Sequence, residues 1–351
     1  MIAALDATPL SLTSGGLRRY VTELSLALAH GFPEDRFVLM SNQAFSCPAG
    51  APGNLSAVSA PGPGRWWLNG VRKTIRETGT AVFHGTNFEV PWLGRTPSVL
   101  TIHDLSPWLD PAWHHAADRV RLRTPWLVRL GRAKLIITVS EAMRRQVITH
   151  FDVAEARVRA VPLAAASMFQ PVARTGTPPY FLCVATLEPR KNIPALVEAW
   201  RASRAATGAE LWLVGRQRED FVPLPPEPGL RVLGEVPDEQ LPGLISGALA
   251  FVYPTLYEGF GLPVLEAMQC GCPVITSRDP AVMEVSGGAA IHTSTLLEMT
   301  EGMISLARQP NLRARLAEGG RKRAGAFSWS RTACETRAIY KGLAREELAR
   351  A

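Results

Sequence analysis

The stretch Tyr257–Gly271, which reads YEGFGLPVLEAMQCG, carries the signals from which the fold can be predicted. The apolar run Ala250–Tyr253 before it predicts a buried strand. Two glycines early in the stretch allow the backbone to turn sharply and to approach a ligand closely. Pro263 suits the first turn of a helix and Gly271 suits its C-terminal cap. The stretch therefore predicts a strand, a turn and a short helix that begins near Leu262.

The turn and the two glutamates around it indicate a class of ligand. Backbone N–H groups around Gly259–Pro263 lie at the start of the predicted helix, where phosphate binds well. Glu258 precedes the turn, and Glu266 follows on the helix. Because carboxylates do not bind phosphates, we expect both to bind hydroxyl groups, as a sugar nucleotide would offer on either side of its diphosphate. The alternative is a structural turn with a solvated Glu258 and a helix-favouring Glu266.

The segment EGFGLPVLEA, residues 258–267, resembles the E-x7-E motif of family 4 glycosyltransferases, which have the GT-B fold. The resemblance implies that Glu258 binds hydroxyls of the donor sugar and that Glu266 binds the nucleotide ribose. It also implies that backbone groups of Gly259, Phe260, Gly261 and the adjoining Leu262 face the diphosphate.

A basic pair, Arg190 and Lys191, follows the first strand predicted in the second half of the chain. A guanidinium fork and a compact ammonium both suit a diphosphate, although most such pairs are solvated basic turns. The segment ATLEPRKN, residues 185–192, resembles the diphosphate-binding segment of the family, with Thr186 beside the donor. Asn192 is a plausible helix N-cap. Farther on, the resemblance implies that Glu235 and Val236 lie under the nucleotide base and that Glu284 bonds backbone amides.

Strand ends in the first half of the chain carry further polar residues. VLTIHDLSPWLDP, residues 99–111, resembles the segment of the family whose histidine reaches the donor sugar, so His103 is the expected site residue. We expect Asp104 to position the loop, with a weaker acceptor role, and His84 to be a weak acceptor-side candidate. Ser140 suits a helix N-cap. The pair at residues 15–16, Gly15 and Gly16, is either a donor-side glycine loop or a plain helix start.

Apolar strands alternate with helices along the whole chain, which predicts an α/β protein with doubly wound parallel sheets. With the resemblance, this implies two Rossmann-like domains facing across a cleft, as in GT-B enzymes. The predicted boundaries are residues 1–165 for an acceptor domain, 166–179 for a linker, 180–326 for a donor domain, and 327–351 for a C-terminal helix that packs back on the first domain. The Pro- and Gly-rich region Cys47–Gly64 is predicted to be a surface loop.

Composition restricts the compartment and the partners. The chain has 351 residues, a net charge of +7 and five cysteines without zinc-ligand spacing. It shows no signal peptide and no run approaching ~18 apolar residues, so we expect a cytoplasmic protein. The basic segment Arg65–Arg76 with its tryptophans, and Arg119–Arg132 with Trp108, Trp113 and Trp126 nearby, fit an anionic membrane surface. The alternative, slightly favoured for the first segment, is a helix with its apolar face in the core. Dispersed basic residues do not favour nucleic acid.

The expected reaction is transfer of a hexose with retention of configuration and without a metal cofactor. The sequence contains no D-x-D motif, and Arg190 and Lys191 can stabilise the leaving diphosphate instead. The opening LDAT (5–8), together with TIHDL (101–105) and LEPRKN (187–192), looks most like bacterial mannosyl- or rhamnosyltransferases of surface polysaccharides. The resemblance implies a GDP-sugar in preference to a UDP-sugar and a glycan or polyprenyl-linked acceptor. A sugar-nucleotide epimerase and a non-catalytic sugar-nucleotide-binding protein are the alternatives.

Overall fold

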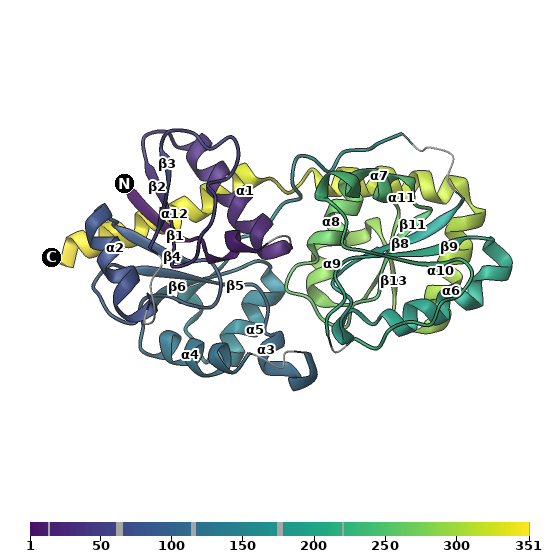
Figure 1. The fold of residues 1–351 in the computed structure, drawn as a ribbon, viewed down its shortest axis with the longest axis horizontal. Helices are drawn as coiled ribbons and strands as arrows, with labels where there is room; N and C mark the ends of the chain where they lie inside the picture. The colour runs from purple at the N-terminus through teal and green to yellow at the C-terminus, as the bar shows by residue number, and fades with distance from the viewer. Residues whose placement is uncertain (13–14, 61–65, 114–116, 174–177, 220, 351) are drawn as a thin grey trace. The chain divides into compact units, whose positions relative to one another are not determined.

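The structure, a computed structural model, describes residues 1–12, 15–60, 66–113, 117–173, 178–219 and 221–350. The chain forms two compact units (Figure 1). The first unit contains residues 1–163 and 328–351, and the second contains residues 164–327. The expected linker, 166–179, thus falls at the start of the second unit, with residues 174–177 outside the described part of the chain.

The first unit is built on a seven-stranded parallel sheet with the order β3-β2-β1-β4-β5-β6-β7. Its strands are β1 Ile2–Asp6, β2 Arg36–Ser41, β3 Leu55–Ser59, β4 Val82–Gly85, β5 Ser98–Ile102, β6 Ala133–Thr138 and β7 Val158–Ala160. Its α-helices are α1 Gly16–Gly31, α2 Val71–Thr78, α3 Ser106–Leu109, α4 Asp118–Arg129, α5 Glu141–Phe151 and α12 Trp329–Arg350. Short helical turns complete it: η1 Thr8–Ser11, η2 Trp66–Gly70, η3 Pro111–Trp113 and η4 Glu155–Arg157.

The sequence interpretation was wrong for part of the Pro- and Gly-rich region. Residues Leu55–Ser59 within it form β3, which pairs in parallel with β2 at the edge of the sheet. Only Leu55 of this strand is buried, so the strand lacks the continuous apolar run by which the other strands are recognised. Residues 61–64 of the predicted loop lie outside the described residues.

Helix α12 packs on the first unit, where it lies against α1 (yellow and purple in Figure 1). Tyr340 on this helix is fully buried, and its hydroxyl lies 2.5 Å from Nδ1 of His84 at the end of β4. Arg337 on the same helix pairs with Asp35, which also accepts a hydrogen bond from the N-terminal amine. These contacts join the C-terminal helix to the central strands of the first unit.

The second unit contains a six-stranded parallel sheet with the order β10-β9-β8-β11-β12-β13. Its strands are β8 Tyr180–Val184, β9 Glu210–Val214, β10 Leu230–Gly234, β11 Ala250–Tyr253, β12 Val274–Ser277 and β13 Ile291–Thr293. Its helices are α6 Ile193–Thr207, α7 Leu241–Gly247, α8 Leu262–Gln269, α9 Pro280–Ser286, α10 Leu296–Arg308 and α11 Pro310–Ala324, with turns η5 Pro189–Lys191, η6 Asp238–Gln240 and η7 Gly287–Ala289.

Both sheets are parallel and most of their successive strands are connected through helices, so the prediction of two Rossmann-like α/β halves is confirmed. Buried apolar side chains fill the central strands; all four residues of β11, for example, are buried. Among the described residues, no helix is both long and apolar enough to cross a membrane.

Candidate functional site

Two loops at the carboxyl ends of neighbouring strands form the centre of the site in the second unit. Strand β8 leads into turn η5 and helix α6, and β11 leads through the glycine turn into α8. Because β8 and β11 pair directly in the sheet, the loops that follow them lie together. The backbone joins them as well, since the Leu256 N–H donates to the Arg190 carbonyl at 2.8 Å. This adjacency brings Arg190 and Lys191 to Glu258.

A buried charge cluster results. The Nζ atom of Lys191 forms an ion pair with Oε1 of Glu258, and Arg190 Nη1 lies 3.5 Å from its Oε2. The side chains of all three are at least 89% buried. The Tyr253 hydroxyl donates to Oε1 at 2.9 Å and also accepts from Lys191 at 2.9 Å, and Thr255 donates to Oε1 at 3.0 Å. Glu258 is therefore paired with both cations that the sequence analysis assigned to a diphosphate.

The electrostatics of Glu258 follow from these neighbours. Burial alone would raise the pKa of its carboxyl, but the charges of Lys191 and Arg190 lower it to about 2. Conversely, burial and the Glu258 charge raise the pKa of Tyr253 well above its ordinary value, so its hydroxyl stays protonated as a donor. The cluster is thus a fixed arrangement of two cations, one carboxylate and one neutral hydroxyl at neutral pH.

Asp279 is a site residue that the sequence interpretation missed. Its Oδ1 accepts from the backbone N–H groups of Ala281 and Val282, which caps α9, and its Oδ2 accepts from the N–H of Glu258 at 3.2 Å. Asp279 thereby holds the loop that carries Glu258. Glu284, for which an amide-bonding role was expected, lies on α9, where its carbonyl accepts from Arg323; the role of its side chain stays a prediction. An Asp followed by proline at a helix start is a capping signal that could have identified it.

Glu188 is a second residue that was missed, and it supports the basic pair from the other side. Its Oε1 accepts from Arg190 Nη2 at 2.9 Å, and its Oε2 accepts from Arg218 at 3.2 Å. Arg190 also donates to the Tyr257 carbonyl at 2.9 Å. The guanidinium is thus held by carboxylate and backbone partners on several sides. The ammonium of Lys191, in contrast, bonds to the Glu258 carboxylate and the Tyr253 hydroxyl.

The remaining donor-side candidates lie around this cluster. Gly261 has a φ of +93°, and a Cβ there would come within 3.1 Å of Val282, which agrees with a glycine requirement. Glu266 is buried on α8. Thr186 follows β8, whereas Glu235 and Val236 follow the exposed edge strand β10. Asn192 is the N-cap residue of α6, as predicted, but it has a left-handed conformation and its side chain makes no capping hydrogen bond.

In the first unit, the polar residues predicted at strand ends have different hydrogen-bond partners and therefore different roles. His103 is half-buried, and its Nε2 donates to the Thr86 carbonyl at 2.8 Å. Burial lowers the pKa of His103, which favours the neutral ring. Asp104 accepts from the N–H and hydroxyl of Ser106, which orders the loop as expected. Ser140 caps α5 by accepting from the Met143 N–H at 3.0 Å, as predicted.

His84 is not placed to meet an acceptor. It is fully buried, and its two ring nitrogens lie 2.5 Å from the Tyr340 hydroxyl and 2.6 Å from the Thr101 hydroxyl. Burial lowers its pKa to about 3, so the ring is neutral. We therefore correct the acceptor-side assignment: His84 joins the sheet to helix α12.

The tryptophan segment likewise differs from the membrane interpretation. Trp66 and Trp67 are buried and pack in the core with Val71 and Ile75, while the basic residues of α2 are exposed. This confirms the core-facing alternative for the part of the segment that is described; Arg65 lies outside it. Trp126 on α4, by contrast, is 53% exposed.

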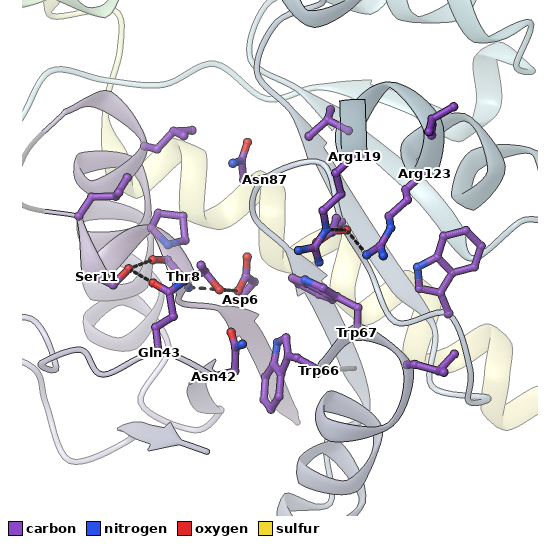
Figure 2. Close-up of a pocket in the computed structure, with 18 of the residues that line it drawn as sticks. Asp6, Thr8, Ser11, Asn42, Gln43, Trp66, Trp67, Asn87, Arg119 and Arg123 are labelled. Carbon is purple, nitrogen blue, oxygen red and sulfur yellow. Dashed lines mark hydrogen bonds and ion pairs between the residues drawn. The ribbon is translucent and has the colours of Figure 1, made fainter. Parts of the chain in front are cut away.

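A cavity of about 920 Å³ opens in the first unit (Figure 2). Residues from the loops after β1, β2 and β4 form one part of its wall, and η2, α4 and Leu17 of α1 form the rest. Figure 2 shows Asp6, Thr8 and Gln43 on one side and Arg119 and Arg123 on the other. Neither His103 nor His84 lines it. No cluster of three metal-ligating side chains occurs in the described part of either unit.

Comparison with known proteins identifies the family. The model "Glycosyltransferase Family 4" matches residues 14–164, and "Glycosyl transferases group 1" matches residues 166–323. The O-antigen chain mannosyltransferase B of Escherichia coli is 34% identical over 291 residues, which are 76% of each chain. The chain belongs to glycosyltransferase family 4. The O-antigen chain mannosyltransferase RfbU of Salmonella typhimurium is a further relative, 26% identical over 65% of each chain.

Solved structures share the fold of this family 4 glycosyltransferase. A sucrose-phosphate synthase from Thermosynechococcus elongatus is similar with a TM-score of 0.77 at 20% identity, covering 97% of this chain and 98% of the other. The Anabaena protein HepE, solved with UDP-glucose, has a TM-score of 0.74 at 16% identity, covering 97% and 99%. These similarities confirm the predicted GT-B architecture. The protein is a glycosyltransferase, as the sequence analysis expected.

The cavity of this glycosyltransferase contains a carboxyl group held at a cost in stability. Burial raises the pKa of Asp6 from 3.8 to about 6, against the bonds from Thr8 that lower it, and the charge of Glu89 raises it further. The native state therefore binds this proton more tightly than the unfolded chain, so stability falls as pH rises from 3.8 through 6.

Replacing Asp6 with asparagine should remove that cost. The amide oxygen can still accept from Thr8, whose hydroxyl lies 2.6 Å from Oδ1. We expect Asp6→Asn to stabilise the protein at pH 7.5 by about 3 kcal/mol, given ~1.4 kcal/mol per pKa unit over the rise from 3.8 to about 6, and to have little effect near pH 4. Denaturant unfolding at both pH values measures this. Equal stabilisation at both would contradict it.

Proposed function

We propose that this enzyme transfers mannose from a GDP-linked donor to a glycan acceptor, with retention of configuration and without a metal cofactor. The observation that carries the proposal is the buried cluster of Lys191, Arg190 and Glu258 beside the glycine turn. It joins cations suited to a diphosphate with a carboxylate suited to sugar hydroxyls. The mannosyl and O-antigen assignments rest on relatives of those names.

The chemistry follows from the charges. As the donor binds, its diphosphate takes Lys191 and Arg190 as partners, and Glu258 turns to hydroxyls of the sugar. The bond between the anomeric carbon and the diphosphate oxygen then breaks, and the electrons stay on the diphosphate. The acceptor oxygen bonds to the anomeric carbon on the same face, and its proton passes to the departing phosphate oxygen. Fixed positive groups stabilise the negative charge that develops, so no metal is required for that step.

Two other functions would also use a sugar-nucleotide site, and each predicts a different outcome from transfer. A sugar-nucleotide epimerase would convert the donor without an acceptor, and a binding protein would hold the donor without turnover. The relatives named above are transferases, and Lys191 and Glu258 are both present and paired in the cluster, so neither alternative is favoured. An acceptor on a polyprenyl carrier at the inner face of the cell membrane agrees with the exposed Trp126 and the arginines of α4.

Calorimetry with GDP, UDP and their sugars tests the donor assignment. We expect GDP and GDP-mannose to bind in the presence of EDTA, with the heat lost in Lys191→Ala. Tighter binding of UDP would discard the mannose assignment and keep the transferase. NMR of the product would show an inverted anomeric centre if the assignment of retention is wrong.

A further inference from the structure

Four buried polar side chains form a continuous series of hydrogen bonds through the first unit. The hydroxyl of Tyr340 on α12 lies 2.5 Å from Nδ1 of His84, and Nε2 of His84 lies 2.6 Å from the hydroxyl of Thr101. The Thr101 hydroxyl in turn lies 3.0 Å from that of Tyr20 on α1. The four residues are at most 2% exposed, so these bonds are shielded from water. The series therefore joins the C-terminal helix, two neighbouring strands and α1.

The protonation of His84 gives the hydroxyls on either side of it opposite roles. Burial keeps the ring neutral, because it lowers the pKa of His84 to about 3. A neutral imidazole has one N–H and one acceptor nitrogen. One of the hydroxyls of Tyr340 and Thr101 therefore donates to the ring, while the other accepts from it. Loss of the Tyr340 hydroxyl would leave a buried ring nitrogen without its partner, which disturbs the rest of the series.

The series ends beside the ring of His103. The rings of Tyr20 and His103 pack edge to face, with 4.7 Å between their centroids and an angle of 82° between their planes. Thr101 lies near the end of β5, and His103 follows that strand, so the two side chains point to the same face of the sheet. Tyr20 thus holds the end of β5 at two points, since its hydroxyl bonds Thr101 and its ring contacts His103.

The tautomer of His103 follows from its other partner. Its Nε2 donates to the Thr86 carbonyl at 2.8 Å, so the proton of the neutral ring lies on Nε2. Burial lowers the pKa of His103, which favours that neutral ring. Nδ1 then has a lone pair and can only accept a hydrogen bond. A sugar hydroxyl can donate to it, whereas an ionised phosphate oxygen cannot. His103 is half-buried, so a ligand can meet its side chain more readily than the four buried ones.

One face of α12 contacts both ends of the series. Trp329 and Tyr340 stand about three helical turns apart on this helix and therefore lie on the same face. The ring of Trp329 lies 6.3 Å from that of Tyr20, measured between centroids, and Tyr340 bonds His84. Helix α12 begins just after the second unit, which ends at residue 327. A shift of α12 would thus act on the surroundings of His103 at two points.

We propose that Tyr20 is a positioning residue for the transfer reaction, and that it fixes the ring of His103 so that Nδ1 accepts from a hydroxyl of the donor sugar. The other members of the series, Thr101, His84 and Tyr340, hold Tyr20 in place. The proposal rests on the proposed function, because it takes the ligand of His103 to be the donor sugar. It gives the C-terminal helix a part in the geometry of the site, beyond its contribution to the stability of the first unit.

Two measurements on the full chain separate positioning from folding. NMR of protein with isotope-labelled histidine reports the protonation and mobility of the His103 ring, whose signals are those lost in His103→Ala. Release of GDP from GDP-mannose, with octyl mannoside as acceptor, gives kcat. Tyr20→Phe keeps the ring beside His103 and removes the bond to Thr101, whereas Tyr20→Leu removes both. Tyr180→Phe is the matched control, since the buried Tyr180 hydroxyl donates to the Leu244 carbonyl at 2.6 Å in the second unit.

We expect the wild-type His103 to give the signals of a single neutral ring protonated at Nε2. Tyr20→Leu should give a mixture of ring states at His103 and a kcat lower by about 10–100-fold, the effect of a misplaced contact near a reacting centre. Tyr20→Phe and Tyr340→Phe should each lower kcat by about twofold to tenfold, as expected for the loss of one hydrogen bond. The Kd for GDP, which lacks the donor sugar, should not change, and Tyr180→Phe should match the wild type.

A second background shows whether Tyr20 acts through His103. In His103→Ala, the further change Tyr20→Leu should lower kcat no more, because the side chain that it positions is absent. An equal loss in both backgrounds, or unchanged His103 signals in a folded Tyr20→Leu protein, would overturn the proposal; if that variant does not fold, Tyr20→Phe takes its place in both comparisons. Failure of the wild type to release GDP from GDP-mannose would refute the donor assignment, and the His103 signals would then decide the positioning role by themselves.

Discussion

Replacing Lys191 with alanine is expected to lower kcat by about 10²–10³-fold, the effect of losing one preorganised donor to a developing anion. The ammonium is buried against Glu258 and Tyr253, away from competing solvent. There its charge acts on the departing diphosphate more strongly than it would in water. Arg190 alone cannot replace it, because its guanidinium is already held by Glu188 and the Tyr257 carbonyl. Single-turnover transfer from GDP-mannose measures the effect.

The Lys191 result needs a control for folding. Removing the ammonium leaves Glu258 paired with Arg190, Tyr253 and Thr255, so the carboxylate keeps partners. Lys191→Met keeps an apolar stem beside the Tyr253 ring and should lose as much activity as the alanine variant. Lys322→Ala, at an exposed lysine of α11, should behave as wild type. Turnover of Lys191→Ala within tenfold of wild type, with the fold intact, would refute the role of the ammonium in departure of the diphosphate.

Local signals explain which parts of this site could be predicted. The turn before α8 was predicted because Gly261 and Pro263 each restrict or free the conformation of the backbone at their own positions. The helix begins at Leu262 as expected. Arg190 and Lys191 were identified as a basic pair after a strand. Their ion pairs with Glu258 were not predicted, because 67 residues separate Lys191 from Glu258 and the two loops meet only through the pairing of β8 with β11.

Other features depended on tertiary packing and were missed. Trp66 and Trp67 stand in a basic sequence, but burial against β2 and β4 removes them from the surface. His84 resembled a site residue because it ends a strand; the C-terminal helix, 256 residues later, covers it. The cavity at Asp6 combines three loops, the turn η2 and the distant helix α4, which come together only through the fold. The position of a residue at a strand end correctly indicated the carboxyl edge of the sheet. Tertiary packing then determined which of the side chains at that edge are accessible to a ligand.

Replacing Glu258 with glutamine should separate nucleotide binding from sugar transfer. Glu258 is ionised at any working pH, because its pKa is about 2. Its charge holds Lys191 and Arg190 in the free enzyme, so GDP must compete with it for both cations. The amide removes that competition while its oxygen still accepts from Tyr253 and Thr255. We expect the Kd for GDP to be unchanged or lower, by up to about tenfold, which corresponds to ~1.4 kcal/mol.

Transfer should show the opposite response in Glu258→Gln. A carboxylate bonds sugar hydroxyls more strongly than an amide, by roughly twofold in energy, and orientation of the donor sugar depends on it. We therefore expect kcat to fall about 10²-fold, a loss of ~2.7 kcal/mol, while GDP still binds. Calorimetry and transfer assays on the same preparation measure both quantities.

The stability of Glu258→Gln must be followed alongside, because the variant leaves two buried cations with one fewer counter-charge. The lowered pKa of Glu258 means that its contribution to stability is present above pH 4.5 and is lost as pH falls toward 2, so the variant should be less stable than wild type at pH 7. Bound GDP should restore stability by mass action. Glu318→Gln, at an exposed site on α11, should alter neither binding nor transfer. A tenfold weaker Kd for GDP in a folded Glu258→Gln protein would mean that the carboxylate positions the cations for the diphosphate, and competition between Glu258 and the donor would have to be abandoned.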